Sequence, residues 1–295
     1  MKEIKRILSF TRRAVDDYGM ISDGDKIAVG ISGGKDSLTL LYALSELRRF
    51  YPAKFELAAI TVDMGFDTPV DWEPVRALCG ELGIEYTVVP TKIAHVVFDV
   101  RQEKNPCGLC AKMRRGSLHD ECKRQGCNKL ALGHHFDDVV DTFMLNLFYE
   151  GRLGSFSPVT YLSRKDLTMI RPLIYAQEKD VRYFVRRHPL PVIESPCPAD
   201  KKTERESMKR LLATLERDNK GLRHRIFGAM QKAGIDGYHE GRLMKFPDDE
   251  LDVESDMSTD EQSESKPPLE CVVGGESSHE RADDLKSPPP KHTVP

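Results

Sequence analysis

The chain has 295 residues, of which 39% are hydrophobic and 31% charged, an ordinary composition for a soluble globular protein. No apolar run approaches the roughly 18 residues of a membrane span, and the N-terminus carries no apolar leader, so we expect a cytoplasmic protein without membrane contact. The formal net charge of −3 hides a segregation, because residues 243–295 hold 14 Asp and Glu against 5 Lys and Arg, which leaves +6 on residues 1–242.

Alternating strands and helices are predicted for the first half of the chain. Short, almost wholly apolar runs predict buried strands at 26–31, 55–63, 86–89 and 129–133. Apolar residues at helical spacing, or a basic helical stretch, predict helices at 38–47, 69–82, 108–125 and 137–149. This alternation predicts an α/β fold with a parallel sheet covered on both faces, which binds ligands at the carboxyl ends of its strands.

The pattern changes after residue 151. We predict a loop for residues 151–172, an Arg-rich helix for 177–188 and one or two further helices for 203–232. From about residue 246, Asp, Glu, Ser and Pro dominate, and such a segment cannot bury enough apolar surface to order itself. We therefore expect four parts: an N-terminal helix (1–25), an α/β domain (26–175), a basic helical region (176–242) and a disordered acidic tail (243–295).

A candidate phosphate-binding loop, Ser32-Gly33-Gly34-Lys35-Asp36-Ser37, lies between the first strand and its helix. The glycines allow a tight turn that brings backbone N–H groups against an anion, and the helix adds its positive N-terminal end. Ser32 and Ser37 can donate hydroxyl hydrogen bonds, and Lys35 adds a positive charge. Asp36 is interpreted as a magnesium ligand or a helix cap. A plain Gly-rich turn is the alternative, and the spacing is not that of a Walker loop.

This loop resembles the hallmark S-G-G-x-D-S of the PP-loop ATP pyrophosphatases. Within that superfamily the chain most resembles the tRNA 2-thiocytidine synthetase (TtcA-like) family. The segments that carry the resemblance lie between about residues 30 and 200: Ser32–Ser37, Pro106–Gly116, Leu132–Asp138, Arg171–Leu173 and Glu178–Asp180. The resemblance implies a parallel sheet of the adenine nucleotide alpha-hydrolase-like type with a small basic helical extension. It also implies an enzyme that cleaves ATP, transfers AMP to the C2 oxygen of a cytidine in tRNA and then inserts sulfur.

Cys107 and Cys110 have the C-x-x-C spacing of a metal, cluster or redox site, and they lie at a helix start that favours thiolates. The resemblance implies that this pair and Cys197 hold a [4Fe–4S] cluster, whose open iron would carry the sulfur. A structural zinc site that adds Cys122 and Cys127 is the main alternative, and free thiols throughout are the other.

Three further residues at the carboxyl ends of the second and fourth strands are expected to face ATP: Asp63, Gly133 and His134. Asp137 and Asp138 open the next helix, where one is expected to bind Mg²⁺ or transfer a proton and the other to cap the helix; the sequence does not say which. Arg114, one helical turn after the cysteine pair, is expected to steady the phosphate or the cluster, a solvated arginine being the alternative.

RNA contacts are expected from the basic helical region, where residues 200–232 hold 10 Lys and Arg against 5 Asp and Glu. The candidate residues are Arg182, Arg186, Arg187, Lys201, Lys202 and Arg205. The expected partners are tRNA and a sulfur donor, either a cysteine desulfurase or free sulfide, and a homodimer is left open. The alternative functions are a PP-loop ligase or amidase with another acceptor and a non-catalytic, nucleotide-sensing zinc protein.

Overall fold

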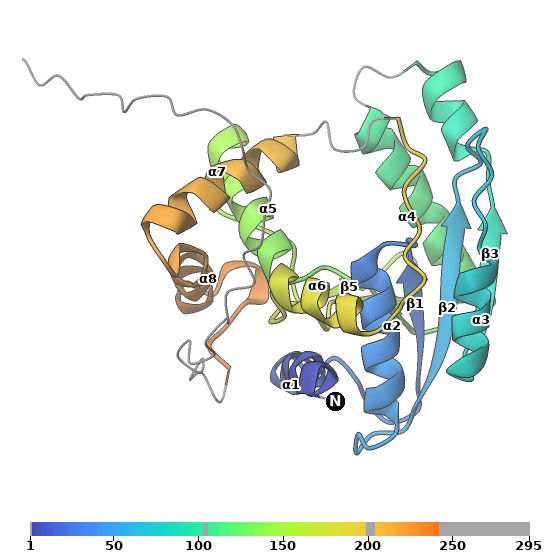
Figure 1. The fold of residues 1–295 in the computed structure, drawn as a ribbon, viewed down its shortest axis with the longest axis horizontal. Helices are drawn as coiled ribbons and strands as arrows, with labels where there is room; N and C mark the ends of the chain where they lie inside the picture. The colour runs from blue at the N-terminus through green and yellow to red at the C-terminus, as the bar shows by residue number, and fades with distance from the viewer. Residues whose placement is uncertain (1, 103–105, 199–203, 242–295) are drawn as a thin grey trace, which may run out of the picture. The chain divides into compact units, whose positions relative to one another are not determined.

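The computed structural model describes residues 2–102, 106–198 and 204–241. Within these residues the centre is a six-stranded sheet (Figure 1), in the order β3 (Glu85–Pro90), β2 (Phe55–Asp63), β1 (Asp25–Ile31), β4 (Lys129–Ala131), β6 (Leu167–Ile170) and β5 (Val159–Leu162). Neighbouring strands pair in parallel except β5, which is antiparallel to β6 at the edge. The predicted α/β class with a mostly parallel sheet is confirmed.

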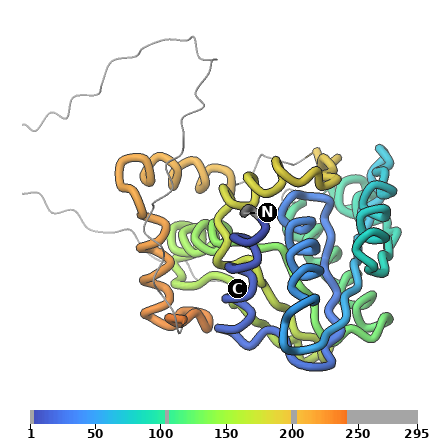
Figure 2. Tube along the Cα trace, turned by 60° about the horizontal axis from the view of Figure 1, so that its bottom comes forward, coloured from blue at the N-terminus to red at the C-terminus, as the bar shows by residue number. Residues whose placement is uncertain are grey.

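Helices cover both faces of this sheet (Figures 1 and 2). One core is built with apolar residues from α1 (Lys2–Asp17), α2 (Lys35–Arg48), α3 (Glu73–Glu81), α5 (Phe136–Tyr149), α6 (Glu178–Arg187), α7 (Glu204–Asp218) and α8 (Leu222–Lys232). The other is built with α4 (Pro106–Arg124) and a π-helical turn, η1 (His95–Val100). A 3-10 turn, η2 (Ile235–Gly237), follows α8.

Alternating side chains of the inner strands supply these two cores. In β1, Ile27, Val29 and Ile31 enter the core with α1 and α2, whereas Ala28 enters the core with α4. Both faces of the strand are therefore buried, which is why the sequence reads as a continuous apolar run rather than an alternating one. The four strands predicted from such runs are all present, with ends that differ by at most two residues.

The predicted loop at 151–172 is wrong, because this segment contains the hairpin of β5 and β6. Each strand has only four residues, and Thr, Tyr and Met dilute the apolar pattern on which the prediction depended. The turn between them ends at Asp166, whose φ of 45° is left-handed. β6 pairs with β4 across about 40 residues of chain, so tertiary pairing rather than local pattern decides its conformation.

The order of the strands defines where a ligand is expected. From β1 the chain proceeds to β2 on one side, whereas β4 lies on the other side of β1. Loops at the carboxyl ends of β1 and β4 therefore diverge, and such a switch point forms a crevice in open α/β sheets. The predicted acidic tail, together with Lys201 and Lys202, lies outside the described residues. No helix of the described part of the chain is long and apolar enough to cross a membrane.

Candidate functional site

The phosphate loop, Ser32–Ser37, connects β1 to α2 at this switch point. Gly33 has a left-handed φ of 83°, a conformation that favours glycine. The Ser37 hydroxyl accepts a hydrogen bond from the Ser32 amide at 3.1 Å and donates one to the Gly34 carbonyl at 2.9 Å. The loop thus holds its own shape and leaves α2 to begin at Lys35, with its free N–H groups facing the loop.

Gly133 packs directly on the phosphate loop from the neighbouring strand. A Cβ at this position would lie 3.0 Å from the backbone carbon of Asp36 and 3.0 Å from the backbone nitrogen of Ser37. Any side chain would therefore press on the loop backbone. The sequence predicted that Gly133 faces ATP, and the structure places it in contact with the backbone of the predicted phosphate loop.

The charged groups of the loop are held by a residue on α6. The Lys35 ammonium lies 3.1 Å from an Asp36 oxygen and 3.2 Å from a Glu178 oxygen. Burial by itself would lower the pKa of Lys35, but these two carboxylates outweigh it and raise the pKa. Glu178 also receives Arg182 at 3.0 Å and Lys209 of α7 at 3.9 Å. One carboxylate thus links the phosphate loop, α6 and α7.

Three aspartates surround His135, whose side chain is almost fully buried. Its Nε2 lies 3.7 Å from Asp36 Oδ1 and 3.5 Å from Asp138 Oδ2, and its Nδ1 lies 3.9 Å from Asp137 Oδ2. Asp138 Oδ2 also accepts the backbone N–H of His135 at 3.1 Å and so caps α5. Burial favours a raised pKa for Asp138, but the two neighbouring histidines, this hydrogen bond and Arg205 lower it. Asp138 is therefore ionised at neutral pH.

Asp137 has a different set of partners from Asp138. Its Oδ2 accepts the backbone N–H of Glu178 at 2.7 Å, and its Oδ1 lies 3.4 Å from Arg223 of α8. Asp137 thereby caps the start of α6 and ties it to α5 and α8. Both oxygens of Asp137 thus contact protein groups, as do those of Asp138, but the partners of Asp137 belong to α6 and α8.

One oxygen of Asp36 accepts no hydrogen bond. This Oδ1 is buried, has no hydrogen-bond partner among the described residues and lies 3.7 Å from His135 Nε2. A buried carboxylate oxygen without a hydrogen bond beside a phosphate loop has the chemistry that a hard divalent cation such as Mg²⁺ prefers. The residues at this point therefore fit Mg²⁺ held jointly by Asp36 and the phosphates of ATP.

Asp63 and His134 lie on either side of the loop. Asp63 accepts hydrogen bonds from the Gly65 amide at 3.0 Å and from the Trp72 indole N–H at 3.4 Å. The Trp72 ring lies against Gly33, since a Cβ added to this glycine would stand 3.3 Å from the ring. Asp63 thus orients a ring that borders the phosphate loop. Burial lowers the pKa of His134 to about 4, so its imidazole is neutral at physiological pH.

The segment that carries Cys197 crosses the phosphate loop. The backbone N–H of Ile193 donates to the Gly33 carbonyl at 2.9 Å, four residues before Cys197. Burial and the charges of Cys197 and Cys107 raise the pKa of Cys110, while Arg114 lowers it. Cys107 and Cys197 are thus near enough to Cys110 for their charges to act on its thiol.

These thiols are a suitable donor set for an iron–sulfur cluster, although no three His, Cys, Asp or Glu side chains of the described residues stand close enough to bind one metal ion. Cys107 is exposed, and Cys110 and Cys197 are half-buried, so all three are accessible. Burial lowers the pKa of Arg114, and the charge of Cys110 opposes this shift. No hydrogen bond or ion pair to the Arg114 guanidinium is present in the described part of the chain, so its charge is available to an anion.

The alternative zinc site with Cys122 and Cys127 is wrong. Cys107 and Cys122 lie on one continuous helix, and at a rise of about 1.5 Å per residue they are about 22 Å apart along its axis. Cys122 and Cys127 are 0% and 1% exposed within the core under α4, and burial raises the pKa of Cys122 to about 12. They are core thiols rather than ligands.

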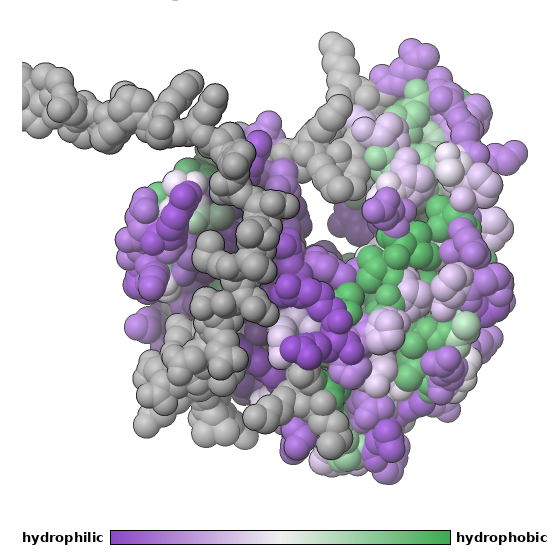
Figure 3. Space-filling model, in the orientation of Figure 1, coloured by the Kyte–Doolittle hydropathy of each residue, from purple (hydrophilic) through white to green (hydrophobic). Residues whose placement is uncertain are grey.

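The predicted RNA-binding residues that the structure describes lie in two different environments. Arg182, Arg186 and Arg187 lie on the exposed side of α6. Arg205 instead reaches inward, 3.4 Å from Asp138 and 3.1 Å from the Thr142 hydroxyl. Arg205 therefore connects α7 to the carboxylates at the start of α5. In Figure 3 the surface is hollowed between α4 on one side and α5 and α7 on the other.

The sequence reasoning missed Glu178, Trp72 and Ile193 as parts of this site. Glu178 lay within the resemblance, and a capping-box pattern at the start of α6 was the available signal. Trp72 is the only tryptophan of the chain and follows the second strand, which marks it as a candidate. The contact of Ile193 with Gly33 is made by the backbone, and no residue type predicts it.

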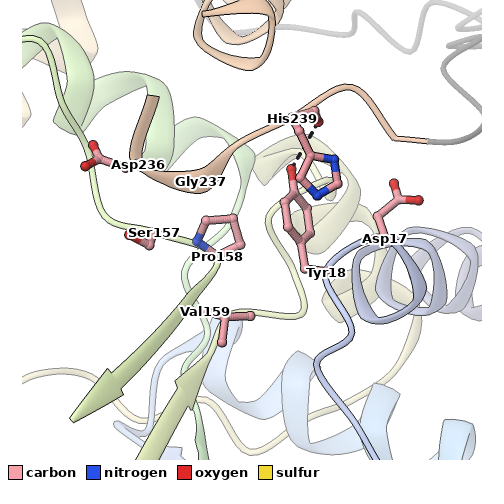
Figure 4. Close-up of a pocket in the computed structure, with 8 residues that line it drawn as sticks. All are labelled: Asp17, Tyr18, Ser157, Pro158, Val159, Asp236, Gly237 and His239. Carbon is pink, nitrogen blue, oxygen red and sulfur yellow. Dashed lines mark hydrogen bonds between the residues drawn. The ribbon is translucent and has the colours of Figure 1, made fainter. Parts of the chain in front are cut away.

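A cavity of about 440 Å³ lies elsewhere and shares no residue with the predicted site. Figure 4 shows its lining residues, Asp17, Tyr18, Ser157, Pro158, Val159, Asp236, Gly237 and His239. The Tyr18 hydroxyl donates to the His239 carbonyl at 3.4 Å, and the carboxylates of Asp17 and Asp236 lie on opposite sides. Its polar groups do not converge on one point.

Comparison with known proteins agrees with this geometry. Residues 4–215 match the PP-loop domain family (ATP_bind_3). The U34-tRNA thiolase NcsA from Methanococcus maripaludis, solved with its [4Fe–4S] cluster, superimposes with a TM-score of 0.64 and 27% sequence identity, covering 76% of this chain and 77% of that chain. The fold and the phosphate loop thus define an ATP-binding protein of the PP-loop class.

Sequence comparison with curated relatives identifies the family within this class. The tRNA-cytidine(32) 2-sulfurtransferase of Syntrophotalea carbinolica is 40% identical over 229 residues, which are 77% of this chain and 88% of the relative. Those of Geobacter sulfurreducens and Teredinibacter turnerae are 38% and 37% identical and are covered over 89% and 82% of their lengths. The chain belongs to the tRNA-cytidine(32) 2-sulfurtransferase family.

Proposed function

We propose that this chain is an ATP-dependent sulfurtransferase that converts cytidine 32 of tRNA to 2-thiocytidine. The observation that carries the proposal is the hydrogen bond from Ile193 to Gly33, which places the segment of Cys197 across the phosphate loop. This contact supports a site in which a thiol-bearing segment lies beside an ATP-binding loop. Both are needed when a base is first activated by ATP and then receives sulfur.

The first step is adenylation of the base. The cytidine C2 oxygen attacks the α-phosphorus of ATP, a C2–O–P bond forms, and pyrophosphate leaves with the electron pair of the broken P–O bond. The amides of the phosphate loop and Lys35 hold the departing pyrophosphate, and Asp36 would hold Mg²⁺, which when bound supplies positive charge to the phosphates. Glu178 keeps Lys35 oriented from the other side.

The second step replaces oxygen by sulfur. A hydrosulfide attacks C2, AMP leaves with the former C2 oxygen, and one proton is released as the C2 thiocarbonyl forms. Cys107, Cys110 and Cys197 would hold a [4Fe–4S] cluster, which when bound supplies a site for the incoming sulfur. Arg114 offers the positive charge that this anionic neighbourhood needs. Free sulfide provides this hydrosulfide directly, whereas a cysteine desulfurase would provide a persulfide whose outer sulfur is released as hydrosulfide by a thiol reductant, which becomes a disulfide.

We assign different roles to the two aspartates at the start of α5. We assign Asp138 to the reacting groups, because it is ionised, faces His135 and has Arg205 as a partner toward the RNA side. Asp137 is assigned to holding α6 in place.

The test supplies the anaerobically reconstituted full chain with ATP, Mg²⁺, sulfide and tRNA that lacks the modification. Release of AMP and pyrophosphate is measured together with 2-thiocytidine at position 32, located by mass spectrometry of nuclease fragments. Lys35→Ala should abolish both products, and Lys54→Ala, which changes an exposed lysine outside the site, should abolish neither. Adenylation that joins tRNA to an amine without sulfur would establish the ligase alternative instead.

A further inference from the structure

One face of α6 is uniformly cationic and carries a single aromatic ring. The exposed residues of this helix are Lys179, Arg182, Tyr183, Arg186 and Arg187. Their spacing of three and four residues places them on one side of the helix, opposite Val181 and Phe184, which are buried. Figure 3 shows strongly hydrophilic side chains gathered over α6.

The acidic residues of α6 neutralise only part of this face. Glu178 is 19% exposed and paired with Lys35 and with Arg182, and Asp180 is 9% exposed and paired with Arg6 of α1 at 2.9 Å. Both carboxylates are therefore largely turned toward the protein. Lys179, Arg186 and Arg187 keep the outward charge of the helix positive, which suits a polyanion.

Tyr183 lies in the middle of this face and is 44% exposed. The Arg187 guanidinium lies 5.6 Å from the centre of its ring, a cation–π contact that restrains the ring. Its hydroxyl has no hydrogen-bond partner in the described residues. An exposed ring backed by arginine and flanked by cations has the chemistry that stacks on an unpaired base.

The position of Tyr183 also fits a substrate that reaches the phosphate loop. Glu178, the first residue of α6, touches Lys35, and Tyr183 lies about 7.5 Å further along the helix axis. A nucleotide a few positions from the reacting base would thus meet the ring while its phosphates meet the arginines.

We propose that this face of α6, with Lys179, Arg182, Arg186 and Arg187, is a docking surface for single-stranded RNA, on which Tyr183 stacks against an unpaired base. The inference rests on the proposed function, because it takes the RNA to be the loop that presents the target cytidine. The arginines bind phosphates and set the affinity, and Tyr183 distinguishes an unpaired loop from a duplex.

Binding of the full chain to a fluorescent tRNA anticodon stem–loop and to a blunt RNA duplex of equal length tests this proposal. Tyr183→Ala should weaken stem–loop binding about tenfold and leave the duplex unaffected, because stacking needs an accessible base. Tyr183→Phe should keep stem–loop affinity, and Tyr161→Ala, at a tyrosine 62% exposed on β5, should change neither. Arg186→Ala should weaken both RNAs and reduce the salt slope by about 0.7–0.9.

The stacking role would be overturned if Tyr183→Ala lost the same affinity for both RNAs, or lost no affinity for the stem–loop. An unchanged affinity of Tyr183→Ala for an ATP analogue is expected, because the ring does not touch the phosphate loop. If wild-type protein thiolates tRNA and the Tyr183→Ala variant binds the stem–loop as tightly as wild type, this inference is refuted and the proposed function stands. Wild-type protein that binds no tRNA refutes the proposed function as well.

Discussion

Glu178 offers the sharpest test of how the site is held together. Its carboxylate lies 3.2 Å from Lys35, 3.0 Å from Arg182 and 3.9 Å from Lys209, and its side chain is only 19% exposed. Glu178→Gln keeps the shape of the side chain and removes its charge. The variant leaves Lys35 with Asp36 as its remaining carboxylate, so the loop should stay folded while its link to α6 and α7 weakens.

The size of the effect follows from the pKa. Burial by itself would raise the pKa of Glu178, but Lys35, Lys209 and Arg182 outweigh it and lower the pKa from 4.5 to about 2. A depression of this size corresponds to about 3 kcal/mol at neutral pH. Screening by solvent reduces what is measured, so we expect Glu178→Gln to lower the free energy of unfolding by about 1–3 kcal/mol.

The pH dependence has a definite sign. Because the folded pKa is lower than the unfolded one, the stabilisation is fully present above about pH 4.5 and is lost as the pH falls toward 2. Urea unfolding between pH 3 and 7 should therefore show a difference in the free energy of unfolding between wild type and variant, and this gap should narrow below pH 4.5. Glu46→Gln, which breaks a surface pair with Arg49, is the matched control and should cost at most about 1 kcal/mol.

A gap between wild type and Glu178→Gln that stays constant down to pH 3 would refute this reasoning, since an ion pair must weaken when its carboxylate is protonated. A gap no larger than that of Glu46→Gln at pH 7 would show instead that solvent screens the pair completely.

Three further outcomes are expected. Gly133→Ala should lower ATP turnover and cost about 1–3 kcal/mol, because its Cβ meets the loop backbone at 3.0 Å, whereas Gly116→Ala, with open space around it, should be neutral or stabilising in urea unfolding. Cys110→Ser should lose the iron of anaerobic preparations and Cys122→Ser should keep it; the reverse pattern in metal analysis would contradict the assigned donor set. Lys35→Ala should bind ATP more weakly by about 1.5–3 kcal/mol in calorimetry while its circular dichroism stays native, and an unchanged affinity would remove the lysine from the site.

Local pattern was enough to predict the strands and helices of the first half of the chain and the phosphate loop between them. The apolar run of β1, the two glycines and the following Leu-rich helix are neighbours in sequence, so their conformations depend mainly on each other. The same reasoning failed at β5 and β6, which have four residues each and obtain their stability from pairing with β4 and with one another. Short strands carry too little periodicity to be recognised alone.

Residue types were enough to select the groups that carry charge or sulfur, but not to assign their partners. Asp137 and Asp138 are adjacent in sequence and equivalent in chemistry, and only the packing of α6 and α8 turns the first into a structural cap. Cys110 and Cys122 lie on one helix, yet Cys110 is half-buried and within reach of the Cys197 charge, whereas Cys122 is fully buried in the core. A helix presents different faces to different surroundings, so the chain determined which donors exist, and the tertiary structure decided which of them meet.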